Sequence, residues 1–318
     1  MNKAIVLPST WSEQAEIFMA RLNEIQPCFF SIAIPCGSYE DSPSFLKLQS
    51  KLLAQSGAQS ALIVVPKSWA KVEFMKHWQT VICNESDDPV ICSLFFADEW
   101  PEVETLLQEF LEEKVDKYPK THLTCQYQPP YTAMLDLWSK AGAKEYHPGD
   151  YYKSEILTAI SNMTGNWVYW GHGEANLLRG YGHLEKDELL AHVPPKPLNA
   201  TLWFTCSTLD KHESENIALS WYRSGATKCL MASPNKINTQ ANQQLSEAWL
   251  SAVKSQPLAC ISEVVLKLIQ EESEEITEVL SNYYLLGNPW VPAGLGNKNY
   301  QSVGQLTDST HSPTRCNK

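Results

Sequence analysis

Two short apolar segments each end in a side chain that can take part in nucleophilic chemistry. Residues 167–173 read Trp-Val-Tyr-Trp-Gly-His-Gly and place His172 between two glycines. Residues 201–207 read Thr-Leu-Trp-Phe-Thr-Cys-Ser and place Cys206 at the end of the run. Runs of this kind are typical of buried strands, and the carboxyl ends of parallel neighbours meet at one edge of a sheet. We therefore expect His172 and Cys206 to lie side by side as a base and its thiol.

A histidine beside a cysteine can perform nucleophilic catalysis. A free thiol has a pKa of about 8.5, so an imidazole that accepts its proton or pairs with the thiolate activates it at neutral pH. Each residue also has a structural interpretation. A cysteine that ends an apolar run is often a core side chain, and a histidine beside glycines often belongs to a turn. Gly171 and Gly173 favour catalysis, because backbone without side chains lets a substrate approach closely and leaves an amide as donor.

The order of the two segments resembles that of the caspase-like cysteine peptidases of clan CD, which include caspases, gingipains, separases and CHAT proteins. These enzymes place an apolar run ending in His-Gly before a run ending in Cys, whereas papain-like enzymes have the cysteine first. Residues 222–233 resemble the Gly-Ala strand that follows the nucleophile in gingipain and CHAT sequences, and residues 283–289 resemble their Leu-Leu-Gly-Asp-Pro close. The resemblance is closest to the gingipain-like or CHAT-type branch and covers about residues 130–295.

The resemblance implies a cysteine endopeptidase that cleaves protein substrates through a thioester acyl-enzyme. Cys206 would be the nucleophile, His172 would transfer protons, and the backbone amides of Gly173 and Cys206 would form the oxyanion hole. Members of the group use either a dyad or a third residue that varies between branches. Asp150 is a candidate for orienting His172. An equally direct interpretation makes Asp150 the N-cap of a helix that begins at Tyr151.

The preferred substrate side chain is an open question in the sequence. Relatives that cut after Arg or Lys place an acid two positions before the nucleophile, where this chain has Phe204. Glu174, Asp210 and Glu213 lie near the two segments, and a pocket carboxylate would favour a basic side chain through charge-assisted hydrogen bonds. The alternative is that these carboxylates lie on solvated loops. Cleavage after basic residues is therefore a hypothesis.

Two further functions fit the same residues. A peptidase-like fold without turnover would serve as a scaffold or interaction module, and a cysteine-dependent acyltransferase or amidase would share the dyad but use another acceptor. The presence of His172 and Cys206 with both flanking glycines favours an enzyme. The resemblance also implies that activity can depend on activation by a partner protein, a metal ion or self-cleavage.

A sheet is needed to bring the two segments together, and the chain has the pattern of an α/β fold. Strands rich in Val, Ile and Phe alternate with segments of helical periodicity, which is typical of a mostly parallel sheet covered by helices. In the first part we expect strands at residues 4–7, 29–34, 60–65 and 90–96 and helices at 11–25, 45–56, 68–78 and 102–117. In the second part we expect helices at 131–141, 151–162, 213–223, 238–254, 258–272 and 274–282, with a polar loop through Gly180 and Gly182.

The domain organisation follows from composition and from the extent of the resemblance. Residues 119–130 contain Tyr-Pro and Pro-Pro and are typical of a connection. We expect an α/β companion subdomain at residues 1–125 and a caspase-like three-layer sandwich with a mostly parallel sheet at 126–295. A flexible tail is expected at 296–318, which is polar and poor in large apolar residues. An unrelated α/β domain is the alternative for the first part, which has none of the motifs.

Charge and hydropathy narrow the range of partners. The chain of 318 residues has 25 Lys and Arg against 36 Asp and Glu, and its net charge of −11 argues against direct binding to nucleic acid. No apolar run approaches the roughly 20 residues that span a bilayer, and the N-terminus lacks a signal pattern. We therefore expect a cytoplasmic protein that does not bind membranes. Its expected partners are a protein or peptide substrate and an activating protein.

The cysteines and histidines do not suggest a cofactor. The nine cysteines are an odd number without Cys-x-x-Cys spacing, which favours reduced thiols over a disulfide framework. Together with His172, His183 and His192 they match no metal-ligand pattern. No glycine-rich phosphate loop follows an expected strand. We expect neither a metal nor an organic cofactor.

Overall fold

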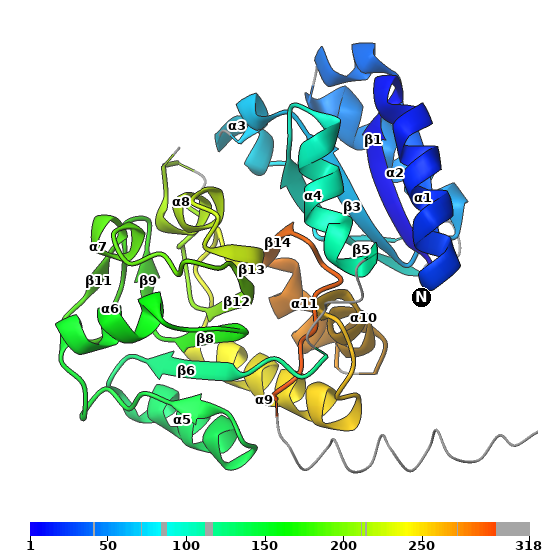
Figure 1. Ribbon diagram of the computed structural model, residues 1–318. Coiled ribbons are helices and arrows are strands. Elements are labelled where there is room, and N and C mark those ends of the chain that lie inside the picture. The colour runs from blue at the N-terminus through cyan, green and yellow to red at the C-terminus, as the bar shows by residue number, and fades with distance from the viewer. Residues whose placement is uncertain are drawn as a thin grey trace, which may run out of the picture.

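The structure is a computed structural model that describes residues 1–40, 42–70, 72–83, 88–111, 117–210, 212–213, 215–271 and 273–296. Within these ranges an eleven-stranded sheet extends through both halves of the chain. Its strands are β1 (Lys3–Pro8), β2 (Phe29–Ile34), β3 (Ser60–Val65), β4 (Val81–Cys83), β5 (Pro89–Phe96), β6 (Thr121–Cys125), β7 (Lys144–Glu145), β8 (Asn166–Trp170), β12 (Leu198–Phe204), β13 (Thr227–Ala232) and β14 (Tyr284–Gly287). They pair in the order β2-β1-β3-β5-β14-β13-β12-β8-β6-β7, and β4 pairs with β5 (Figure 1).

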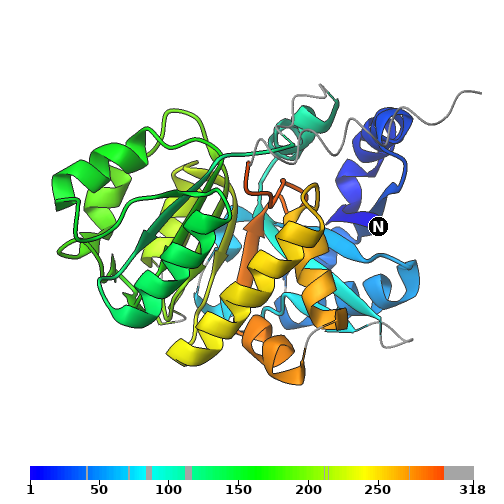
Figure 2. The same cartoon turned by 90° about the horizontal axis from the view of Figure 1, so that it is seen from below.

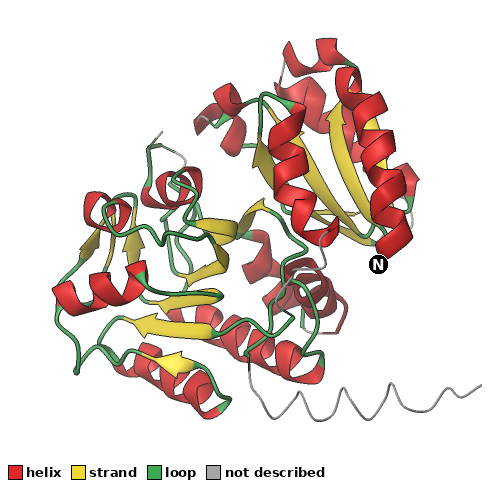
Figure 3. Cartoon of the chain, viewed as in Figure 1, coloured by secondary structure: helices red, strands yellow, loops and turns green. Residues whose placement is uncertain are grey.

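Helices pack on both faces of the sheet (Figure 2, Figure 3). One face is covered by α2 (Ser42–Ser56), α3 (Val72–Met75), α6 (Lys153–Ser161) and α8 (Ile217–Arg223). The other face is covered by α1 (Ser12–Ile25), α4 (Trp100–Leu111), α5 (Pro129–Lys140), α9 (Thr239–Ser255), α10 (Ile261–Glu271) and α11 (Glu274–Ser281). Every residue of β3 and β8 is buried, because a parallel sheet between two helical layers has no solvated face. The expected three-layer α/β sandwich with a mostly parallel sheet is confirmed.

The strand direction reverses within the sheet at β14. This strand pairs parallel with β5 and antiparallel with β13. Apart from β4, the strands on each side of this point are parallel to one another. The carboxyl ends of β6, β8, β12 and β13 therefore share one edge of the sheet, and those of β1, β2, β3 and β5 lie at the opposite edge.

The connection expected at residues 119–130 contains the strand β6. Its five residues are all buried and pair with β8, from Thr121 opposite Asn166 to Cys125 opposite Trp170. Because this strand contains threonine and histidine, it lacks the apolar run that would predict a buried strand from the sequence. In the folded chain these side chains find partners, since Thr124 Oγ1 accepts a hydrogen bond from Trp167 Nε1 at 2.7 Å. Pairing joins β6 to the later strands, and the domain boundary expected at residue 125 stays a prediction.

Two other expected elements differ in the structure. Residues 68–78 form a 3-10 turn (Lys67–Trp69) followed by the short helix α3, and their aromatic rings pack on one another, with Trp69 5.0 Å from Phe74. The loop expected through Gly180 and Gly182 is present between β10 (Leu177–Leu178) and β11 (Leu184–Glu185), but it is shorter than expected. These two strands form a small antiparallel sheet with β9 (Gly173–Glu174), and α7 (Lys186–Leu190) follows. Strands of two residues are too short to leave a pattern in the sequence.

The tail expected at residues 296–318 lies outside the described residues from position 297 onward. No helix in the described ranges combines the length and apolarity that a bilayer crossing requires. The cytoplasmic location expected from the sequence stays a prediction.

The core beneath the ends of β8 and β12 is aromatic. Trp170 and Phe204 are partners across the two strands, and their rings stack with centroids 6.1 Å apart and 9° between their planes. The indole N–H groups of Trp138 and Trp170 both donate to Ser246 Oγ, at 3.1 and 2.8 Å. Because buried N–H groups need an acceptor, one hydroxyl on α9 holds two rings that support the strand ends.

Replacing Ser246 with alanine would leave two buried indole N–H groups without an acceptor. Each such group costs about 1–3 kcal/mol. We therefore expect Ser246→Ala to lower the free energy of unfolding by at least about 2 kcal/mol in urea denaturation. Ser251→Ala, at an exposed position of the same helix, is the matched control and should change it by less than about 0.5 kcal/mol. Equal stability of the two variants would contradict this role of Ser246.

Candidate active site

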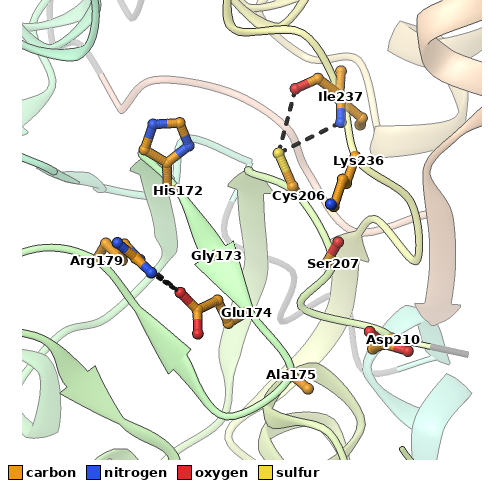
Figure 4. A pocket seen from close by; sticks show the side chains of 10 residues that line it. All are labelled: His172, Gly173, Glu174, Ala175, Arg179, Cys206, Ser207, Asp210, Lys236 and Ile237. Atoms are coloured by element: carbon orange, nitrogen blue, oxygen red, sulfur yellow. Dashed lines mark hydrogen bonds and ion pairs between the residues drawn. The ribbon is translucent and has the colours of Figure 1, made fainter. Parts of the chain in front are cut away.

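The pairing of β8 with β12 brings His172 and Cys206 to the same edge of the sheet. The two strands are parallel, with Trp170 opposite Phe204 at their ends, and each candidate residue follows two positions later. Both residues line one pocket of about 600 Å³ (Figure 4). The remaining lining residues come from the segments that follow β8, β12 and β13, namely Gly173, Glu174, Ala175, Arg179, Ser207, Asp210, Lys236 and Ile237.

The backbone of His172 is held on both sides. Its amide donates to Gln126 Oε1 at 2.9 Å, next to the end of β6. Its carbonyl accepts from the Tyr169 hydroxyl at 3.2 Å and from the Arg179 amide at 2.9 Å. These contacts fix the main chain from which the exposed imidazole extends into the pocket.

The imidazole contacts a residue that the sequence did not single out. Tyr131, in the first turn of α5, places its hydroxyl 3.4 Å from His172 Nε2, and the two rings meet edge to face with centroids 5.7 Å apart. The same hydroxyl lies 3.3 Å from Thr239 Oγ1. Burial raises the pKa of Tyr131, so the phenol is protonated at neutral pH. With Nε2 facing Tyr131, Nδ1 is the ring nitrogen left for a thiol.

The sulfur of Cys206 is partly buried and bonds to the loop after β13. Its thiol donates to the Ile237 carbonyl at 3.3 Å and accepts from the Ile237 amide at 3.4 Å (Figure 4). The following residue, Ser207, has a φ of 49° and donates its amide to the Asn235 carbonyl at 3.0 Å. Non-glycine residues in this left-handed region are strained and are found at tight functional turns. The loop after β13 thus holds both the sulfur and the turn that presents it.

The glycines beside His172 are required by protein packing. A Cβ on Gly173 would lie 2.5 Å from Thr205 Oγ1 and 2.6 Å from the Cys206 carbonyl oxygen, and one on Gly171 would collide with the Tyr169 hydroxyl. These contacts reflect a close approach of two protein segments, and the expectation that the glycines also let a substrate approach stays a prediction. This approach sets the backbone of Gly173 directly against that of Cys206. The roles of their amides in an oxyanion hole stay predictions.

The predicted acids are distributed unevenly around the pocket. Glu174 lines the pocket and forms an ion pair with Arg179, whose Nε donates to it at 2.7 Å (Figure 4). Asp210 also lines the pocket, and its Oδ1 accepts from the His212 amide at 2.7 Å. Glu213 is exposed beyond this turn and is absent from the pocket lining. Two of the three acids therefore face the predicted dyad.

Asp150 lies in the turn before α6, where its amide donates to the His147 carbonyl at 2.9 Å. It does not line the pocket. The expected N-cap position is wrong, because the cap of α6 is Tyr152, whose amide donates to Glu155 at 2.8 Å. Tyr131 makes the side-chain hydrogen bond to the imidazole, and Asp150 gains no support as its orienter.

Within the described part of the chain, no group of three or more His, Cys, Asp or Glu side chains is arranged to hold a metal ion.

Comparison with known proteins agrees with this architecture. The structure matches the complex of Porphyromonas gingivalis RgpB pro- and mature domains with a TM-score of 0.61 at 11% identity, covering 92% of this chain and 79% of that one. It matches the crystal structure of the Arg-specific cysteine proteinase gingipain R (RgpB) with a TM-score of 0.59 at 10% identity, covering 92% and 78%. At this identity the two structures establish the shared fold. No curated protein matches the chain.

The family model of Peptidase family C25 matches residues 52–293, which is more than half of the chain. This match agrees with the gingipain-like resemblance of the His-Gly and Cys segments. The chain belongs to peptidase family C25 and is a cysteine peptidase with the caspase-like fold of the gingipains.

Proposed function

We propose that the chain is an endopeptidase that cleaves polypeptides with Cys206 as nucleophile and His172 as its base. The observation that supports this most directly is that both residues line one pocket at the shared edge of β8 and β12. A scaffold without turnover would be favoured by a blocked cleft or by side chains at different edges. The pocket instead holds both groups that acyl transfer needs.

The chemistry follows from the contacts of the two side chains. The sulfur first turns from the Ile237 carbonyl toward the imidazole. His172 Nδ1 then takes the thiol proton while the sulfur attacks the carbonyl carbon of the scissile bond. The amides of Gly173 and Cys206 stabilise the negative oxygen that forms. The imidazolium protonates the leaving amine, which departs and leaves a thioester on Cys206. Water deprotonated by His172 then hydrolyses the thioester.

We further propose that Asp210 favours a basic side chain in the substrate. The position two residues before the nucleophile cannot supply an acid, since Phe204 is buried there and stacks on Trp170. Arg179 neutralises Glu174, so Asp210 is the pocket carboxylate without an ion pair among the described residues. A guanidinium or ammonium group would gain a charge-assisted hydrogen bond there. Lys236, on the pocket wall, opposes this preference by like-charge repulsion.

The dyad is tested by replacing its members one at a time. We expect Cys206→Ala and His172→Ala to lower cleavage of a mixed peptide library by at least about 1,000-fold. The library is read by mass spectrometry with added amine acceptors, so that hydrolysis and acyl transfer give different products. Cys36→Ala is the matched control, because Cys36 is an exposed thiol in the other half of the chain. Cleavage that survives in the Cys206 variant would contradict the proposal, and exclusive formation of amine adducts would favour an acyltransferase.

The substrate preference is tested at Asp210. We expect Asp210→Asn to lower kcat/KM for peptides with arginine before the cleaved bond by about tenfold, since a charge-assisted hydrogen bond becomes a neutral one. Matched leucine peptides should change by less than about twofold. Glu174→Gln is the control and should have a smaller effect on arginine peptides, because Arg179 already pairs with that carboxylate. An equal loss for arginine and leucine peptides would contradict a specificity role for Asp210.

A further inference from the structure

One short segment, residues 237–239, contacts Cys206 directly and is linked to His172 through Tyr131. At its start, the amide and carbonyl of Ile237 bond to the sulfur of Cys206 at 3.4 and 3.3 Å. At its end, Thr239 Oγ1 lies 3.3 Å from the hydroxyl of Tyr131, and that hydroxyl lies 3.4 Å from His172 Nε2. The thiol is therefore held directly, and the imidazole through one intervening phenol.

We propose that Tyr131 is the positioning residue of His172 and that, with Thr239, it couples the imidazole to the segment that holds the thiol. This inference rests on the proposed function, because it assigns a role in the same site. Tyr131 accepts the proton of His172 Nε2 in a hydrogen bond and donates its own proton to Thr239 Oγ1. This arrangement keeps the proton on Nε2 and leaves the lone pair of Nδ1 for the thiol.

The chemistry of the phenol permits this direction of the hydrogen bonds. A hydroxyl has one proton and two lone pairs, so it can accept from the imidazole while it donates to threonine. Tyr131 is 5% exposed, and burial raises its pKa, so it stays neutral over the pH range in which histidine titrates. The edge-to-face packing of the two rings, at 85°, restricts rotation of the imidazole as well. When Nδ1 takes up a proton, the bond from Nε2–H to Tyr131 persists and stabilises the imidazolium.

No described carboxylate takes this position. Glu174 pairs with Arg179, Asp210 accepts from the His212 amide, and Asp150 lies outside the pocket. A neutral phenol stabilises an imidazolium less than a carboxylate does, because it carries no opposite charge. The dyad therefore depends on precise placement of Tyr131 and Thr239.

The segment that carries these contacts is fixed from both sides. Asn238 caps α9 by accepting from the Gln240 amide at 2.8 Å. Before it, Asn235 donates its side-chain amide to Asn282 Oδ1 at 2.9 Å and accepts from the Ser207 amide. A displacement of residues 237–239 would move the contacts of sulfur and imidazole together. Anything that orders or shifts this loop would thus change both members of the dyad at once.

The test is the pH dependence of Cys206 alkylation by iodoacetamide, followed at that residue by mass spectrometry. We expect Tyr131→Phe to move the midpoint of alkylation upward by roughly 0.5 pH unit, because the imidazolium that accompanies the thiolate loses an acceptor. Thr239→Val should shift the midpoint in the same direction by less. In peptide hydrolysis, Tyr131→Phe should lower kcat by about three- to tenfold with little change in KM.

Tyr39→Phe is the control, because it removes the hydroxyl of a partly buried tyrosine in the other half of the chain, where that hydroxyl donates to the Val64 carbonyl. It should leave the midpoint and kcat unchanged. An unaltered midpoint in Tyr131→Phe would overturn the inference, whether or not hydrolysis falls. Alkylation does not require turnover, so the two proposals can fail separately. If the wild-type chain cleaves no peptide but its midpoint shifts with Tyr131, the proposed function fails and the positioning role stands.

Discussion

The parallel register of β8 with β12 is the constraint on which the proposed chemistry depends. Five residue pairs define it, and the last sets Trp170 opposite Phe204. A slip of one residue would send every side chain of a strand to the other face of the sheet. It would remove Trp170 from Ser246 and from its stack on Phe204. The aromatic core below the edge therefore determines where His172 and Cys206 leave the sheet.

Contacts among the segments that follow β8, β12 and β13 shape the site around His172 and Cys206. The bare backbone of Gly173 allows the segment after β8 to lie against the segment after β12. The loop after β13 then supports the turn at Ser207 and bonds to the sulfur through Ile237. In the structure the thiol donates to the Ile237 carbonyl, and the proposed mechanism requires the sulfur to turn from that carbonyl toward the imidazole.

The sequence predicts β2 and β3 to the residue and both strand ends of the site, because short runs rich in Val, Ile, Phe and Trp favour strands. Of these strands, β3 and β8 are buried on both faces. The sequence does not predict β6, because its threonines and histidine are polar. In the folded chain, hydrogen-bond partners on other elements allow these side chains to be buried. Tyr131 is missed for a related reason. It lies 41 positions from His172, and the contact is created by the packing of α5 beside the sheet edge. The sequence also singles out Gly171 and Gly173. In the structure, tight protein packing leaves no room for a side chain at either position.

In the proposed mechanism, one imidazole and one sulfur act together on a carbonyl group at the shared end of β8 and β12. A crystal structure of the chain with a peptide chloromethyl ketone would test it most directly. If Cys206 is the nucleophile, its Sγ displaces chloride and forms one thioether bond to the methylene carbon of the inhibitor, with the imidazole of His172 beside that bond. The proposed mechanism also predicts that the inhibitor's carbonyl oxygen accepts from the amides of Gly173 and Cys206. Modification of another residue, or a carbonyl oxygen directed away from those amides, would contradict it.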